Sequence, residues 1–152
     1  MTIREFRKED EASFLRCVRD GWNERSVYDA VDYCLIDPYW YADNVLYNPA
    51  YIVLVAVDVA GDVVGYMVGR LDSENMKIIM LFVIPMYRRQ GVGRALKLTL
   101  VQTAEKLGCI KVVAYNRFDN DISLNLNKSL GWKITPVSDD HYRTELTLKE
   151  IK

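Results

Sequence analysis

The sequence has little that could cross-link a protein, bind a metal or anchor it in a membrane. Its 152 residues include three cysteines, Cys17, Cys34 and Cys109, and a single histidine, His141. An odd cysteine count without metal-ligand spacing excludes a disulfide framework, and one histidine leaves no Cys/His zinc cluster, so no metal is expected. No apolar run approaches the roughly 18 residues of a membrane span, and the first six residues lack the hydrophobic stretch of a secretory signal. We therefore expect a cytoplasmic protein with no membrane partner.

The length predicts one domain covering residues 1–152. Half of the residues are hydrophobic and 27% are charged, which is the balance of an ordinary globular protein. The net charge of -1 argues against a nucleic-acid partner, because such proteins depend on neutralising many phosphates.

The charges are unevenly distributed along the chain. Residues 76–117 contain eight basic side chains and one acidic one, a net +7, whereas residues 21–50 contain five acids and one base, a net -4. This asymmetry suggests that one region meets an anionic ligand and another a cationic one. Two solvated faces of opposite sign are the alternative interpretation.

Hydrophobic periodicity predicts a mixed α/β sandwich with helices on both faces of the sheet. The irregular stretch of residues 21–49, rich in aromatic side chains, has room for a second helix around residues 26–35 and is predicted to be a binding loop. The predicted strands are residues 2–7, 51–58, 62–70, 77–84, 110–115, 132–137 and 142–148, and the other helices are residues 10–20, 92–107 and 121–130. In the helix of residues 92–107, the side chains expected to face the core are Val92, Ala95, Leu96, Leu100 and Leu107.

The most informative segment is the glycine turn at residues 88–94, Arg-Arg-Gln-Gly-Val-Gly-Arg, which lies between a buried strand and a helix. Amides at a helix N-terminus lack internal partners and attract phosphate, and glycine lets a ligand approach the backbone closely. Neither common nucleotide motif fits: Arg94 stands where a Walker loop has lysine, and Leu96 stands where a Rossmann fingerprint has its third glycine. A tight turn without a ligand is the alternative.

Two motifs together resemble the GNAT superfamily of N-acetyltransferases. The first is Arg88-x-x-Gly91-x-Gly93, which follows Val83-x-Pro85 at the end of a hydrophobic strand. The second begins at Asn120, continues through Ser123 and Leu126, and closes with Leu130-Gly131-Trp132. The resemblance covers essentially the whole chain and implies acetyl-CoA as co-substrate. It also implies a GNAT-like mixed sheet of about seven strands with a splay between the fourth and fifth.

The resemblance further implies which residues bind the coenzyme. The backbone amides of the turn would hold the pyrophosphate, and the preceding strand would present its backbone to the pantetheine arm, as in β-augmentation. Asn120 would contact the arm from the other side, or cap the helix that follows it. The predicted coenzyme-binding residues are Leu81, Phe82, Val83, Arg88, Arg89, Gln90, Gly91, Val92, Gly93, Arg94 and Asn120.

The expected chemistry is direct attack of a neutral primary amine on the thioester in a ternary complex. The resemblance offers the Val83 N–H as donor to the developing oxyanion. Family members commonly place a tyrosine acid seven residues after the motif asparagine, where this chain has Asn127. An amide can donate a hydrogen bond but delivers no proton, so Asn127 is predicted to stabilise the thiolate. Tyr115 is an alternative acid or part of a water chain, or else a packing residue.

The sequence does not identify the general base or the acceptor. Glu74, Asp29, Asp32 and Asp37 are the candidate bases, together with water held by the backbone; Cys34 would allow a covalent route, but no side chain is spaced to activate it.

Aromatic walls with nearby acids in residues 21–50 suit a small-molecule amine, a lysine side chain or a peptide N-terminus. Packing against the sheet is the alternative role for Tyr39, Trp40, Tyr41 and Tyr47. A non-catalytic acyl-CoA-binding or regulatory module and a nucleotide-binding protein are the competing functions, and the final strand pair predicts a homodimer.

Overall fold

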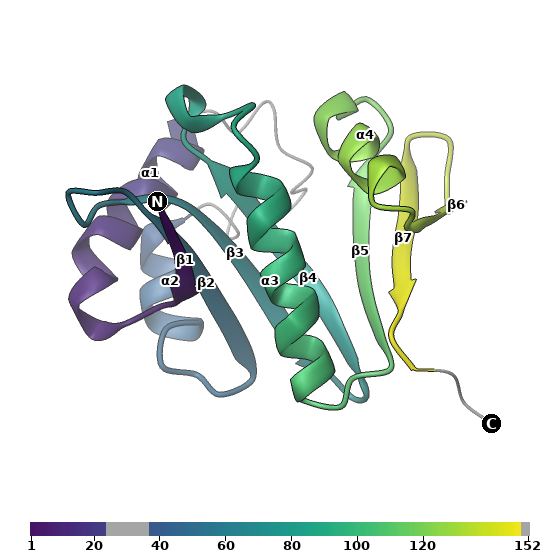
Figure 1. Cartoon of the computed structure of the whole chain (residues 1–152), viewed down its shortest axis with the longest axis horizontal. Helices are drawn as coiled ribbons and strands as arrows, with labels where there is room; N and C mark the ends of the chain where they lie inside the picture. The colour runs from purple at the N-terminus through teal and green to yellow at the C-terminus, as the bar shows by residue number, and fades with distance from the viewer. Residues whose placement is uncertain (24–36, 150–152) are drawn as a thin grey trace.

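The computed structural model describes residues 1–23 and 37–149, which form a seven-stranded sheet covered by helices on both faces (Figure 1). None of the helices in these ranges is long and apolar enough to cross a membrane. The prediction of a mixed α/β sheet with helices on both faces is confirmed. In chain order the elements are β1 (Thr2–Glu5), η1 (Lys8–Asp10), α1 (Glu11–Asn23), α2 (Pro38–Asn44), β2 (Tyr51–Val57), β3 (Val63–Asp72), β4 (Asn75–Val83), η4 (Pro85–Tyr87), α3 (Val92–Lys106), β5 (Lys111–Arg117), α4 (Asp121–Ser129), β6 (Lys133–Pro136) and β7 (His141–Thr147).

The strands lie in the order β1-β2-β3-β4-β5-β7-β6. Neighbouring strands are antiparallel except β4 and β5, which are parallel because α3 carries the chain back across the sheet between them. This β4-α3-β5 unit contains the glycine turn at its first corner. Because the glycine turn connects β4 to α3, it lies next to the parallel strands β4 and β5.

The sheet separates two hydrophobic cores, which explains why β2 and β3 are almost continuously apolar. On one face, α1 and α2 pack over β2, β3 and β4 through residues that include Phe14, Tyr41 and Tyr66. On the other face, α3 packs through Leu96 and Leu100. Both faces of the central strands β2 and β3 are therefore largely buried.

Strands β4 and β5 pair only at one end, where Asn75–Lys77 lie beside Lys111–Val113. Beyond these residues the two strands diverge, as Figure 1 shows. A β-bulge contributes to the divergence: Val68 pairs with Met80 and Gly69 with Ile78, which leaves Ile79 as an extra residue on β4. A bulged strand bends and twists away from its neighbour. The predicted splay between the fourth and fifth strands is confirmed.

Three details differ from the prediction. The helix α2 at Pro38–Asn44 was not predicted; Asp37 caps it by accepting a hydrogen bond from the Tyr39 amide. Leu107, expected in the core, follows the last turn of α3 and is 51% exposed, whereas Lys97 is buried. The helix predicted around residues 26–35 lies outside the described residues.

Candidate active site

The glycine turn adopts a backbone conformation suited to binding an anion. Arg88 is extended, and Arg89 and Gly91 have positive φ angles of 63° and 81°. Left-handed residues interspersed in a turn direct successive amides toward one side and form an anion-binding nest. For Arg89 this conformation is strained, because non-glycine residues rarely adopt it.

Among the described residues, the amides of residues 89–94 in this turn have no hydrogen-bond partner. The first bond of α3 runs from the Ala95 amide to the Gly91 carbonyl, so the amides of Val92, Gly93 and Arg94 precede the helical ladder. In residues 1–23 and 37–149, no hydrogen bond from the amides of residues 89–94 to another protein group is present. Together with the N-terminal dipole of α3, these amides can hold a diphosphate.

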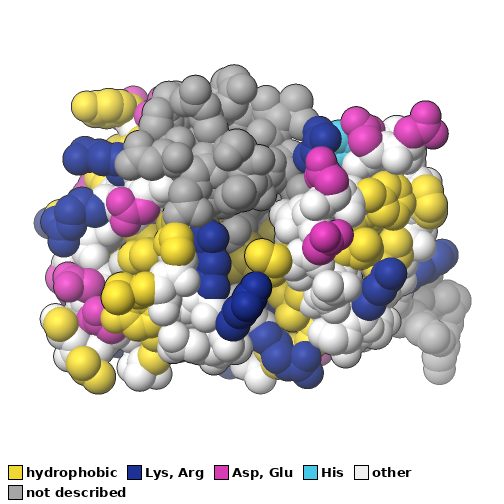
Figure 2. All heavy atoms as spheres, turned by 90° about the horizontal axis from the view of Figure 1, so that it is seen from above, with side chains coloured by type: hydrophobic (Ala, Val, Ile, Leu, Met, Phe, Trp, Pro, Cys, Tyr) yellow, Lys and Arg dark blue, Asp and Glu magenta, His cyan; other side chains and the backbone are white. Residues whose placement is uncertain are grey.

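The basic side chains of the turn take different positions. Arg89 and Arg94 are exposed to solvent. Arg88 turns back instead: its Nε donates to the Val83 carbonyl at 2.8 Å and its guanidinium lies 5.6 Å from the centroid of the Phe82 ring. The Gln90 side chain donates to the Met86 carbonyl. Seen from above, Lys and Arg side chains border a hollow near the middle of this face (Figure 2).

Gly93 gives an independent indication of a ligand. Its φ angle is not positive, and a Cβ built on it would lie 3.7 Å from Leu81 Cδ2 and 4.0 Å from Val83 Cγ2, which are ordinary contacts. Neither the backbone conformation nor the packing of the protein therefore requires glycine at position 93. A ligand that approaches the amides closely would require glycine there, because a Cβ would obstruct it.

The open edge of β4 continues the site from the turn into the splay. The Ile84 amide donates to the carbonyl oxygen of Val64 in β3. Because successive residues direct their backbone groups to opposite edges of a strand, Phe82 also faces β3, whereas Leu81 and Val83 face the splay. Of the three residues predicted to present their backbone to the coenzyme, Leu81 and Val83 therefore direct their backbone groups to the open edge, whereas Phe82 directs its backbone groups toward β3. Its ring is buried in the core beneath Arg88.

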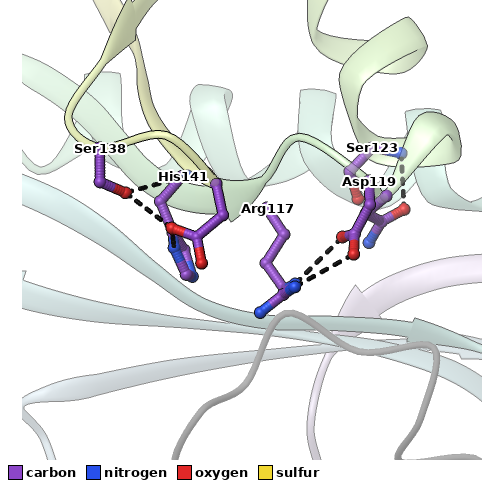
Figure 3. A network of polar contacts seen from close by, with 7 residues as sticks. Arg117, Asp119, Ser123, Ser138 and His141 are labelled. Carbon is purple, nitrogen blue, oxygen red and sulfur yellow. Dashed lines mark hydrogen bonds and ion pairs between the residues drawn. The ribbon is translucent and has the colours of Figure 1, made fainter.

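The other wall of the splay is formed by β5 and α4. The Asn120 side chain caps α4 by accepting a hydrogen bond from the Ser123 amide at 3.2 Å, so its predicted capping role is confirmed. Arg117, at the end of β5, makes a two-bond ion pair with Asp119 (Figure 3). Beside Arg117 in the register lies His141, whose imidazole is bound to Asp140. That contact, and a second hydrogen bond from Ser138, lower the pKa of Asp140.

Asn127 lies in a buried network that the sequence did not predict. It is 0% exposed; its Oδ1 accepts a hydrogen bond from Lys97, and its Nδ2 donates to the Tyr142 hydroxyl at 3.1 Å. The Lys97 ammonium also lies 4.1 Å from the centroid of the Trp132 ring. Burial lowers the pKa of Lys97 to about 7. The spacing of four residues from Gly93 to Lys97 places both on one face of α3, and this spacing could have drawn attention to Lys97.

Tyr115 and Asn127 are not brought together. Val112 of β5 packs in the core beneath α3, and alternation along the strand places Tyr115 on the opposite face of the sheet from Asn127. Tyr115 is 48% exposed, with the Lys77 ammonium 5.6 Å from its ring centroid. Any contribution of Tyr115 to catalysis is therefore made from the face opposite α3 and α4.

Two of the candidate bases lie in places that do not suit catalysis. Glu74 is exposed in the turn before β4, at the opposite end of that strand from Val83. The carboxylate of Asp37 is used to cap α2. The remaining base candidates, Asp29 and Asp32, lie outside the described residues, as does Cys34, which would be the nucleophile of a covalent route.

The other cysteines and the aromatic side chains are divided between core and surface. Cys17 and Cys109 are buried, one in each hydrophobic core. Tyr41 is fully buried and makes edge-to-face contacts with Phe14 and Tyr66, and Trp40 packs against the same core. Tyr39 and Tyr47 are exposed, and Tyr47 donates a hydrogen bond to Glu11. Packing therefore accounts for Tyr41 and Trp40.

The chain is similar in sequence to known acetyltransferases. A family model described as the acetyltransferase (GNAT) family matches residues 5–132. An acetyltransferase from Sodalis glossinidius (strain morsitans) is 32% identical over 98 residues, which cover 64% of this chain and 68% of that protein.

Solved structures share the fold over nearly the full length. YncA, a putative acetyltransferase from Salmonella typhimurium solved with acetyl-CoA, is 25% identical with a TM-score of 0.75, covering 100% of this chain and 96% of that one. The PaiA N-acetyltransferase from Thermoplasma acidophilum, solved with coenzyme A, has a TM-score of 0.78 at 17% identity, covering 96% of this chain and 98% of that one.

Proposed function

Since the chain belongs to the GNAT family of acetyltransferases, we propose that it transfers an acetyl group from acetyl-CoA to a primary amine by direct attack in a ternary complex. The observation that carries this proposal is the set of unpartnered amides at residues 89–94 beside the open edge of β4. The turn supplies donors for a diphosphate, and the open edge supplies backbone groups for an extended amide-containing arm. Acetyl-CoA has both parts.

The residues of this chain would act in a defined order. The amides of residues 89–94 and the backbone of Leu81 hold the coenzyme. The amine attacks the thioester carbonyl in its neutral form, and the Val83 N–H donates to the carbonyl oxygen as negative charge develops there. The C–N bond forms, the C–S bond breaks with its electron pair on sulfur, and the amine loses a proton to water. The thiolate, a tolerable leaving group with a thiol pKa of about 8.5, then takes a proton from solvent.

The acceptor is proposed only as an amine. Similar structures include a ribosomal-protein-S18-alanine N-acetyltransferase from Escherichia coli and an aminoglycoside 6'-N-acetyltransferase, so related folds serve both protein and small-molecule acceptors. An α-amino group, with a pKa of about 7.7 to 8.0, needs less help to lose its proton than a lysine at about 10.4. Cytoplasmic location and homodimer formation stay predictions from the sequence.

The test is release of thiol from acetyl-CoA across a panel of amines, with the acetylated product identified by mass spectrometry. Binding is measured separately by calorimetric titration with acetyl-CoA and with ATP. We expect the protein to bind acetyl-CoA and not ATP. Binding of acetyl-CoA without turnover of any amine would favour the acyl-CoA-binding or regulatory module instead. Binding of ATP in place of acetyl-CoA would overturn the coenzyme assignment.

A further inference from the structure

The core between α3 and α4 contains a lysine, Lys97, that has no acidic partner among the described residues. Lys97 is 4% exposed, and in the described parts of the chain no carboxylate lies within ion-pair distance of its Nζ. Burying an ammonium without such a partner costs several kcal/mol, whereas leucine or methionine would fill comparable space without that cost. Packing alone therefore does not explain a lysine at this position.

The contacts of Lys97 fix the orientation of Asn127. An ammonium only donates hydrogen bonds, so the amide oxygen of Asn127 must face it, and the amide nitrogen must point away. One Nδ2–H bond of Asn127 is used by the Tyr142 hydroxyl. The second has no hydrogen-bond partner among the described residues. The network therefore holds one amide donor ready for a further acceptor.

The network connects the two helices that flank the splay. Lys97 is one helical turn beyond Gly93 on the same face of α3, and Asn127 is two turns beyond the cap residue Asn120 on α4. The Lys97–Asn127 pair thus lies one turn further along α3 than the unpartnered amides of residues 89–94. It lies toward the end of the splay where β4 and β5 begin to pair. An anion held between these helices would meet the amides first and the Lys97–Asn127 pair next.

We propose that Lys97 is a positioning residue that acts through Asn127 to stabilise the thiolate of coenzyme A, in the bound coenzyme and as the leaving group of acyl transfer. This inference rests on the proposed function, because it takes the coenzyme sulfur to lie in the splay. The ammonium polarises the Asn127 amide and strengthens its remaining N–H as a donor. The thiolate receives its proton from solvent, so Lys97 transfers no proton to it.

The electrostatics of the surroundings agree with this role. Burial lowers the pKa of Lys97 to about 7, so its charge responds to a nearby anion around neutral pH. Arg94 on α3, Lys128 on α4 and Lys133 on β6 are exposed, whereas Glu145 on β7 is buried and paired with Lys111 and Arg143. The Tyr142 phenol is the other titratable group of the network. A thiolate beside Asn127 would favour the ammonium form of Lys97.

The decisive experiment needs no acceptor. Coenzyme A is bound to the protein, and its thiol is titrated by ultraviolet absorbance of the thiolate, in the wild type and in Lys97→Met. In the wild type we expect the pKa of the bound thiol to lie about one pH unit below its ordinary value near 8.5, a tenfold effect. In Lys97→Met it should return to that value. Leu100→Met, a buried change on the same helix outside the network, should leave the thiol pKa at its wild-type position.

Kinetics give a second readout. Lys97→Met should lower kcat about tenfold, a difference of about 1.4 kcal/mol, and change the KM for acetyl-CoA less than twofold. The wild-type advantage in kcat/KM should shrink as the pH rises past about 7, because the free protein then loses the charge. Lys97→Gln, which keeps a polar side chain without the charge, should behave like Lys97→Met and serves if the latter does not fold.

The outcomes separate the two proposals. If the wild type fails to bind coenzyme A, the proposed function is wrong and the inference about Lys97 is wrong with it. If coenzyme A binds and its thiol pKa is the same in the wild type and both Lys97 variants, the inference about Lys97 alone is overturned.

Discussion

The guanidinium Nε of Arg88 donates a hydrogen bond to the carbonyl oxygen of Val83 at 2.8 Å. This bond ties the glycine turn to the last residue of β4, five residues earlier in the chain. Val83 carries the amide proposed to stabilise the developing oxyanion. Arg88 therefore sets the position of the turn relative to that amide, in addition to placing positive charge beside the site.

The first prediction concerns this bond. Arg88→Met keeps an aliphatic stem but removes the donor, so Val83 should lose part of its fixed orientation and kcat should fall about tenfold. Arg89→Met is the matched control, because Arg89 is exposed and contributes only charge. It should raise the KM for acetyl-CoA a few-fold with little change in kcat. Equal effects of both variants on kcat would contradict a positioning role for Arg88.

The second prediction concerns Gly93. Because a Cβ fits the protein itself at this position, Gly93→Ala should leave the free energy of unfolding unchanged or raise it by up to about 1 kcal/mol. The same methyl group would obstruct approach to the amides, so the Kd for acetyl-CoA should rise at least about tenfold.

Gly131→Ala is the control for Gly93→Ala. Gly131 has a φ of 75° and lies at the end of α4, so alanine there should destabilise the fold by about 1 kcal/mol and leave the Kd unchanged. Calorimetric titration and urea unfolding measure both effects. Unaltered affinity in Gly93→Ala would show that the ligand does not approach this residue.

The third prediction concerns the ion pair between Arg4 and Asp10. Two hydrogen bonds, of 2.6 and 2.9 Å, join the side chains, and the Arg7 amide donates a third to Asp10, which is 3% exposed. The hydrogen bond from Arg4 lowers the pKa of Asp10. A carboxyl whose pKa is lower in the folded than in the unfolded chain stabilises the fold above the unfolded value of about 3.9, and this contribution is lost as the pH falls further.

Asp10→Asn should therefore reduce the free energy of unfolding by about 2 to 3 kcal/mol at neutral pH. The difference from the wild type should shrink below about pH 4, where Asp10 itself becomes protonated. Urea unfolding at several pH values measures it. A difference that stayed constant down to about pH 2 would mean that the charge of Asp10 contributes nothing.

The fourth prediction concerns stability and Lys97. Burial lowers its pKa to about 7 in the folded protein, against about 10.4 in an unfolded chain. Between these values the unfolded chain binds more protons, so the contribution of Lys97 to stability becomes more favourable as the pH rises. Relative to Lys97→Met, the wild type should gain about 2 kcal/mol in the free energy of unfolding between about pH 7 and 9. If the free energy of unfolding changed with pH in the same way in the wild type and in Lys97→Met, the pKa of Lys97 would not be lowered in the folded protein.

Local sequence was sufficient for most of the fold. Alternating and continuous apolar runs predicted each strand found in the described residues. The glycines at 91 and 131 marked the start of α3 and the end of α4, because these signals depend on neighbours a few residues apart. The element order and the two motifs together led to the family. Asn120 was correctly predicted as a cap for the same reason, since its partner Ser123 is three residues away.

Tertiary structure decided what depends on distant partners. The burial of Lys97 follows from its contact with Asn127, thirty residues later, and the extra residue Ile79 is recognised only against the pairing of β4 with β3. The edge to which each backbone group of β4 points, which separates Phe82 from Leu81 and Val83, likewise depends on which strand lies beside it. Local patterns determine which element a residue joins, because they reflect conformational preference and periodicity. The contacts that set the charge of a side chain and the groups that it can contact are made only when separate elements pack together.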